Sequence, residues 1–314
     1  MTEEYSLPTN APSHREARTR GALLRVLGVG FGLAVTVGNT VGTGILRAPG
    51  EVAAQLPDVG LVLAVWFAGA LYALLGAVSV SELGAMLPRS GGYYVFAQRA
   101  LGDFPAFIVG WTDWMAQCGT IAAASIVVGE YAGGLVPWLA GRHVETAVAT
   151  AIGLALVQGR GVRWGSWMQN VSSAVKGGVF VALLGAFFVF GRAPSPALSL
   201  GGRELLPHSL PHGLALAGAV LVALQAVIYT YDGWYGVIYF GEEVRAPGRD
   251  VPRSMIGGVL LVMALYLLVN LALVHMLPLS VLAGQTLAVG TALTQVFGAS
   301  GDGIVRAVAI VTMI

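Results

Sequence analysis

This chain has few charged side chains, one cysteine and one lysine. Charged residues make up 11% of its 314 residues and hydrophobic residues 56%, whereas a typical soluble domain is about 25% charged. A single cysteine, Cys118, excludes a disulfide framework. The formal net charge of +1 says nothing about nucleic acid, but the sequence contains no basic tract, so we expect no nucleic-acid partner. The sequence also lacks His-Glu-x-x-His and P-loop motifs, so we expect no enzyme, no cofactor and no metal site.

Long apolar segments dominate the rest of the chain, and most of them reach the about 20 residues that cross a lipid bilayer. Residues 1–21 are polar, carry mixed charge and contain prolines, which predicts a disordered cytoplasmic tail. We expect residues 22–314 to form one all-α, polytopic membrane domain. Its predicted spans are Val26–Leu56 (broken), Leu61–Met86, Phe104–Trp138, Val144–Val157, Trp167–Phe190, Leu214–Phe240 (broken), Ile256–Leu277 and an eighth from Ile304 that the end of the chain truncates.

The arginines predict how these spans are oriented, because short cytoplasmic loops are rich in positive charge. With a cytoplasmic N-terminus in the cell membrane, three arginines fall outside and most fall inside. The first span then runs outward and the sixth inward, as a five-plus-five inverted repeat requires. The outside residues would be Arg142, Arg192 and Arg203; the inside residues would be Arg15, Arg18, Arg20, Arg25, Arg89, Arg99, Arg160, Arg163, Arg245, Arg249 and Arg253.

Glycine interrupts two of the apolar segments near their middles. The first interruption is GNTVGTGIL, from Gly38 to Leu46, and the second is YTYDGWYG, from Tyr229 to Gly236. Inside a bilayer, backbone groups freed by a break need partners, and a cavity with a bound ligand supplies them. A pair of such breaks in two inverted halves is typical of the binding site of a secondary transporter.

The first break offers partners for both ends of an α-amino acid. Backbone N–H groups of Thr43, Gly44 and Ile45 would begin the second half-helix, where they and the Thr43 hydroxyl suit a carboxylate. Backbone carbonyls of Thr40 and Val41 would end the first half-helix and suit an ammonium group. A glycine-rich surface for helix packing is the alternative interpretation of this segment.

The second break would complete the same site. We expect the carbonyls of Tyr229, Thr230 and Asp232 to face the first break, and the Tyr229 ring to cover the ligand as a gate. Asp232 is a carboxylate near the middle of the membrane, where ionisable residues are rare and usually functional. Its alternative role is to cap a helix at the break.

Lys176, the only lysine, lies within the fifth predicted span in VSSAVKGGVFVALL. A charge at the centre of a membrane helix costs about 2.5–3.5 kcal/mol on insertion scales. Burial disfavours the charged form of a lysine, so this amine could exchange protons during transport. The alternative is a structural lysine that ties helices together through backbone carbonyls.

Four motifs occur in order along the chain: GNTVGTGIL, SELGAMLPRSGGYYVF (Ser81–Phe96), YTYDGW and GEEVRAPGRDVPRS (Gly241–Ser254). Together they resemble the amino acid–polyamine–organocation superfamily, and most closely its L-type-like bacterial amino acid permeases. The resemblance runs from about Ala22 to the end of the chain. It implies the leucine-transporter fold with broken helices 1 and 6 and a second repeat truncated in helix 8.

The same resemblance implies roles for individual residues. Thr43 and Gly44 would bind the substrate carboxylate, and Tyr229 would be the outer gate. The carbonyls that bind the amino group would be those of Tyr229, Thr230 and Asp232. Lys176 matches a fifth-helix lysine that replaces a sodium ion in sodium-coupled relatives, which favours proton coupling or exchange.

Two other functions compete with proton-coupled amino acid transport. One is a sodium-independent exchanger, which the sequence does not separate from a symporter. The other, much more remote, is an intramembrane serine protease, because GASG around Ser300 resembles the rhomboid Gly-x-Ser-Gly motif. That function needs a histidine on a later span, which this sequence lacks.

Overall fold

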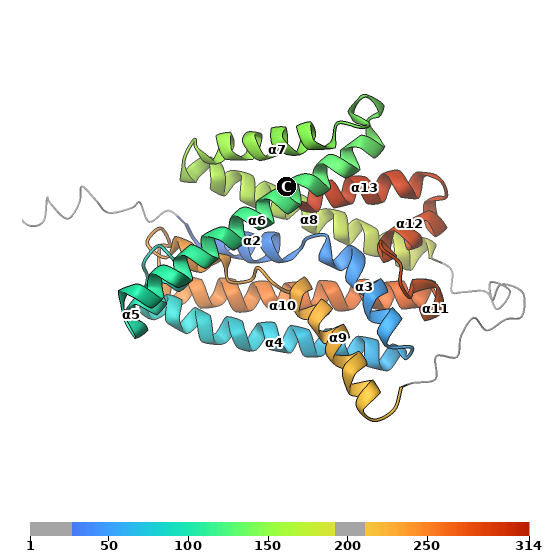
Figure 1. Cartoon of the computed structure of the whole chain (residues 1–314), viewed down its shortest axis with the longest axis horizontal. Helices are drawn as coiled ribbons and strands as arrows, with labels where there is room; N and C mark the ends of the chain where they lie inside the picture. Colours follow the sequence, from blue (N-terminus) through green and yellow to red (C-terminus); the bar gives the residue numbers. More distant parts are fainter. Residues whose placement is uncertain (1–26, 192–210, 314) are drawn as a thin grey trace, which may run out of the picture.

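The computed structural model describes residues 27–191 and 211–313, and these form α-helices joined by turns and short 3₁₀-helices (Figure 1). The predicted tail at residues 1–21 lies outside the described residues. Four helices are long and apolar enough to cross a membrane: α4 (Val59–Met86), α6 (Asp103–Leu135), α8 (Val162–Phe190) and α10 (Pro247–Met276). Helices α4 and α10 lie side by side along the bundle and share the core around Trp66 and Tyr266.

The first predicted break is confirmed. Helix α2 (Val29–Thr40) and helix α3 (Gly44–Gln55) meet at a bend of 46°, and together they make a fifth apolar span. Val41 is extended between them, with φ −79° and ψ 96°. Two glycines within three residues lower the helix propensity here, so the chain leaves the helix at mid-span.

The second predicted break is also present, and the segment that follows it is not an α-helix. Helix α9 (Leu214–Thr230) is followed by turns and by the 3₁₀-helix η4 (Gly236–Phe240). Glycines at 233, 236 and 241 make a regular α-helix unfavourable over this stretch. The first of them, Gly233, has a φ of +105°, which an L side chain rarely adopts.

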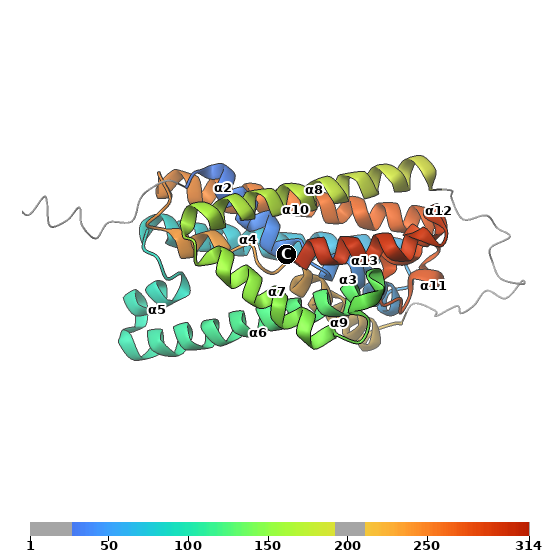
Figure 2. The ribbon, with the colours of Figure 1, turned by 90° about the horizontal axis from the view of Figure 1, so that it is seen from above.

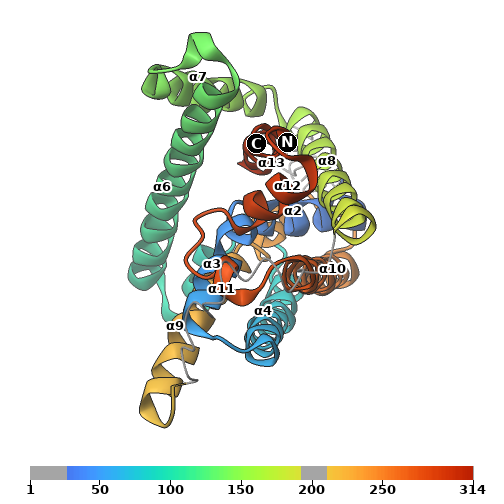
Figure 3. The ribbon, with the colours of Figure 1, turned by 90° about the vertical axis from the view of Figure 1, so that its right-hand side faces the viewer.

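Helix α6 packs against α5 (Tyr93–Leu101) and against α7 (His143–Gln158). Figure 3 shows α6 and α7 as an arm beside the main bundle. The sequence from Arg89 to Leu101 mixes aromatic residues with Arg99 and predicts an interfacial amphipathic helix. Helix α5 lies within this segment, and its position at a membrane interface stays a prediction. Helices α7 and α9 have 16 and 17 residues, somewhat less than the about 20 that span a bilayer.

The segment from Pro278 to Ser300, whose sequence predicts an external and partly re-entrant loop, is helical over most of its length. Helices α11 (Leu279–Leu282) and α12 (Ala288–Phe297) form there, and α12 packs against α3 and α13 (Ser300–Met313). Gly298 has a φ of +60°, and the position of Gly301 is packed against the backbone of Thr294. The glycines of the protease-like GASG motif thus form the tight turn between α12 and α13.

The start of α2, helix α5, the start of α8 and the segment from η4 to α10 gather at one end of the bundle (Figures 1 and 2). Leu27 joins Val244 there in a single β-bridge: the Leu27 N–H donates to the Glu243 carbonyl at 3.0 Å, and the Arg245 N–H donates to the Leu27 carbonyl at 2.8 Å. The beginning of the first span is therefore tied to the chain that follows the second break.

Candidate functional site

The two helix breaks lie directly against each other. A Cβ atom on Gly44 would stand 3.3 Å from the Cα of Thr230, and one on Gly233 would stand 2.7 Å from the carbonyl oxygen of Asn39. Glycine at both positions lets the backbones approach more closely than side chains would allow. The polypeptide segments that the sequence predicts to form one site are thus in contact.

The last carbonyls of α2 receive hydrogen bonds from side chains of two other helices. A helix that ends leaves its final carbonyls without intrahelical donors, and its C-terminus carries partial negative charge. The Lys176 ammonium of α8 donates to the Gly38 carbonyl at 2.9 Å. The Tyr266 hydroxyl of α10 donates to the Thr40 carbonyl at 2.8 Å. The break in the first span therefore creates acceptors that a cation and a phenol occupy.

Lys176 is 5% exposed and belongs to a row of polar donors along α8. One and two turns before it, Ser173 and Gln169 donate to the Ala34 carbonyl at 2.6 and 3.2 Å. Gly38 makes this approach feasible, because a Cβ atom there would collide with the Ser173 hydroxyl. Lys176 is thus buried beside the first break, and both the coupling and the structural interpretation fit this geometry.

At the first break, the groups available to a ligand come more from the backbone than from side chains. Thr40, Val41 and Ile45 are buried, whereas Thr43 and Gly44 are partly accessible. Helix α3 begins at Gly44, and the Thr43 side chain makes no capping hydrogen bond. N–H groups in the first turn of a helix lack intrahelical acceptors and favour an anion.

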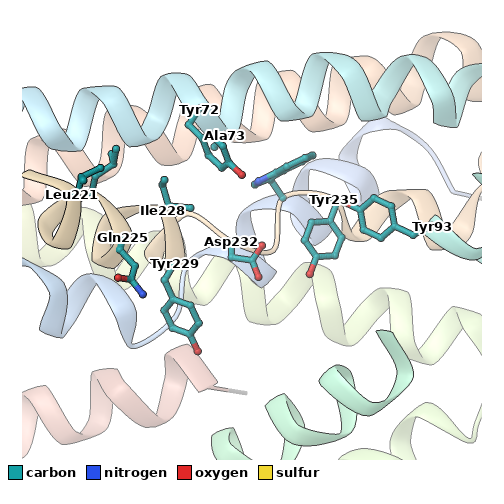
Figure 4. Close-up of a pocket in the computed structure, with 11 residues that line it drawn as sticks. Tyr72, Ala73, Tyr93, Leu221, Gln225, Ile228, Tyr229, Asp232 and Tyr235 are labelled. Atoms are coloured by element: carbon teal, nitrogen blue, oxygen red, sulfur yellow. The ribbon is translucent and has the colours of Figure 1, made fainter. Parts of the chain in front are cut away.

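Of the predicted site residues at the second break, two line a cavity and one lies in the core. A cavity of about 590 Å³ is bounded by α4, α5, α9 and the turn after α9. Tyr229 and Asp232 line it, and Figure 4 shows their side chains on the same side of the turn. Tyr229 is 80% exposed. Thr230 instead is buried, and its hydroxyl donates to the Ala226 carbonyl at 2.8 Å.

The aromatic character of this cavity comes from several elements. Together with Asp232, the cavity is lined by the rings of Tyr72, Tyr93, Tyr229, Trp234 and Tyr235. Among the described residues, those of the first break and Thr230 do not line this cavity. The eight predicted site residues therefore form two adjoining groups, a backbone group at the meeting point of the breaks and an aromatic–acidic group in the cavity.

The sequence interpretation missed Tyr266, which is 0% exposed and donates to carbonyls of both breaks, at 2.8 Å to Thr40 and 3.3 Å to Thr230. A signal was available in the sequence. Tyr266 and Asn270 are polar residues in the middle of an otherwise apolar segment, where a polar group normally needs a specific partner.

Comparisons with known proteins show that this chain is similar in sequence to amino acid transporters. The chain is 27% identical over 296 residues to the serine/threonine exchanger SteT of Bacillus subtilis, which covers 93% of this chain and 64% of SteT. It is 30% identical over 276 residues to the b(0,+)-type amino acid transporter 1 of Mus musculus, covering 85% of this chain and 55% of the relative. The human b(0,+)-type amino acid transporter 1 is 30% identical over 258 residues, which cover 80% of this chain and 51% of that protein.

The chain thus spans between about half and two thirds of the length of these relatives. Residues 30–314 match the family model described as amino acid permease. This match includes both broken segments, the lysine on α8 and the motif after the second break. The chain belongs to the amino acid permease family, within the amino acid–polyamine–organocation superfamily.

Proposed function

We propose that this chain carries the substrate site of a secondary active transporter that moves amino acids across the cytoplasmic membrane by alternating access. The observation that carries the proposal is the contact between the two helix breaks, which brings helix-terminal N–H groups and carbonyls together at mid-span. Membership of the amino acid permease family supports it. The names of two relatives, a serine/threonine exchanger and an amino acid transporter, support an amino acid as the substrate.

Backbone groups would recognise the two charges that every amino acid shares. The substrate carboxylate would accept from the N–H groups of Thr43, Gly44 and Ile45 and from the Thr43 hydroxyl, near the positive end of α3. The substrate ammonium would donate to carbonyls of the residues Thr40, Val41, Tyr229, Thr230 and Asp232. The cavity beside Tyr229 and Asp232 would then receive the substrate side chain.

The proposed membrane arrangement is the inverted repeat of the leucine-transporter fold, with a cytoplasmic N-terminus and helices 1 and 6 broken. Among the described residues, the segments at the end of the bundle where Leu27 pairs with Val244 carry predicted cytoplasmic arginines, which supports this orientation. These are Arg89, Arg99, Arg160, Arg163, Arg245, Arg249 and Arg253. The lipid bilayer would cover the apolar surface of α4, α6, α8 and α10.

Lys176 would couple transport to protons. Its ammonium donates to the Gly38 carbonyl at the end of α2, so a movement of α2 changes the environment of the amine. A sodium-independent exchange without proton flux is the second candidate function, and the name of SteT favours it.

Tyr229 is proposed to be the gate, because it borders both the break and the cavity while most of its ring is exposed. Closing over a ligand would bury that ring. Tyr229→Ala should therefore weaken amino acid binding by about tenfold or more, and Tyr229→Phe should be milder because the ring area does the covering. Binding to the purified variants measures both effects. An alanine variant that binds and transports like the wild type would place Tyr229 outside the gate.

The proposed function is tested by measuring binding of amino acids to the purified full-length protein. A panel of L-serine, L-threonine, L-leucine and L-lysine samples hydroxylated, apolar and cationic side chains. The tightest binder should bind more strongly than the amine that lacks its carboxyl group, because the first break is built to hold a carboxylate. Equal or tighter binding of the amine would contradict this function and favour polyamine transport.

A further inference from the structure

The hydroxyl group of Tyr266 contacts both helix breaks but has no role in the proposed function. It lies on α10, outside both breaks, and is fully buried. It donates to the Thr40 carbonyl at 2.8 Å and contacts the Thr230 carbonyl at 3.3 Å. One side chain from a third helix thus touches the final carbonyl of α2 and the final carbonyl of α9.

These two carbonyls are the ones that end the half-helices before each break. A phenol has a single O–H donor, so one proton serves two acceptors here. A carbonyl oxygen can accept two hydrogen bonds. Each carbonyl therefore keeps accepting capacity after its contact with Tyr266, and the pair is held at a separation that one donor can bridge.

The ring of Tyr266 is fixed by its neighbours. It packs against Trp66 at a centroid distance of 5.7 Å and against Tyr231 at 4.9 Å. All three side chains are less than 2% exposed. A ring locked in this way holds its hydroxyl in one place, which is the requirement for a group that positions others.

We propose that Tyr266 is a positioning residue for the substrate ammonium: its hydroxyl holds the Thr40 and Thr230 carbonyls together so that one ammonium group can donate to both. This inference rests on the proposed function. An ammonium has three N–H donors. It binds best where the acceptors are already oriented, because binding then requires little free energy for ordering them. Without the hydroxyl the two broken helices would lose their shared donor, and the carbonyls would separate or turn.

The chain offers a matched control for this hydroxyl. Tyr231 lies in the same aromatic cluster and is equally buried, but among the described residues its hydroxyl makes no hydrogen bond. Tyr266→Phe and Tyr231→Phe therefore remove the same atom from the same environment. They differ in whether that atom contacts the carbonyls of the breaks.

The test compares an amino acid with the acid that lacks its amino group, each binding to full-length wild type, Tyr266→Phe and Tyr231→Phe. The amino acid is the tightest binder among L-serine, L-threonine, L-leucine and L-lysine. We expect Tyr266→Phe to weaken binding of the amino acid by about tenfold, as for a lost hydrogen bond to a charged group. Binding of the deamino acid should change less than about twofold, and Tyr231→Phe should bind both ligands like the wild type.

Three results would overturn the inference: an unchanged affinity of Tyr266→Phe for the amino acid, an equal loss for both ligands, or an equal loss in Tyr231→Phe. The last two would indicate general packing. If wild-type protein binds no amino acid, the proposed function fails and the inference fails with it. If Tyr266→Phe does not purify as a folded protein, fluorotyrosine at position 266 keeps the ring and alters the acidity of the hydroxyl. Amino acid affinity must then shift while deamino acid affinity stays constant, and any other pattern overturns the inference.

Discussion

Gly233→Ala should abolish amino acid binding and lower the melting temperature of the purified protein. Gly233 has a φ of +105°, and a Cβ atom there would lie 2.7 Å from the Asn39 carbonyl oxygen and 3.2 Å from the Thr40 nitrogen. Strained backbone of this kind costs about 1–3 kcal/mol, and overpacking adds about 1–3 kcal/mol. Since the colliding atoms are backbone of the first break, the strain falls on the place where the two breaks meet.

A second glycine in the same segment provides the control. Gly218, on α9, has open space where a Cβ atom would lie. Gly218→Ala should therefore leave binding unchanged and stabilise the helix by at most about 1 kcal/mol. Thermal unfolding in detergent and ligand titration measure both variants. If Gly233→Ala kept wild-type affinity and melting temperature, the contact between the breaks would not be required.

Lys176→Met should make amino acid uptake independent of external pH. In the wild type, uptake should rise as external pH falls, because a protonated Lys176 formed at the outside would carry its proton inward with the substrate. Methionine keeps the approximate length and an apolar stem but does not titrate. It also leaves the Gly38 carbonyl without the donor seen at 2.9 Å, which costs about 1–3 kcal/mol for a buried group.

Ser173→Ala separates loss of titration from loss of helix packing. Ser173 also donates to a carbonyl of α2, at 2.6 Å, but has no proton to exchange at these pH values. Uptake into proteoliposomes across a pH step should keep its pH dependence in Ser173→Ala and lose it in Lys176→Met. Retained pH dependence in Lys176→Met would return this lysine to a structural role, and strong counterflow without pH-driven uptake would favour an exchanger.

Much of the fold follows from the sequence because long apolar segments have few alternatives to helices in a membrane. Helices α4 and α6 begin and end close to their predicted limits, whereas α10 ends close to its predicted limit but begins at Pro247, before the predicted start at Ile256. Both breaks were predicted because glycine clusters interrupt apolar segments at mid-length. Residues 288–297 were predicted to lie in a loop but form a ten-residue amphipathic helix. Their apolar pattern is about half the length of a membrane span, so the sequence did not indicate a helix there.

The candidate site was harder to predict than the fold. Sequence alone indicated that backbone at Gly44 and at Thr230 would act together, and the structure brings them into contact. It did not indicate which helix would supply partners for the freed carbonyls, because that depends on how α8 and α10 pack. Lys176 was noticed because a charge in an apolar segment is conspicuous. Tyr266 escaped notice because tyrosine is a common core residue.

The central claim is that the two breaks recognise both ends of an amino acid. It is tested most directly by comparing the binding of three ligands that differ by one charged group. The ligands are the tightest-binding amino acid of the panel, the amine without its carboxyl group and the acid without its amino group, each titrated into purified wild-type protein. We predict that either truncation weakens binding by about tenfold or more. Wild-type binding of the amine or of the acid at the affinity of the intact amino acid would contradict the claim.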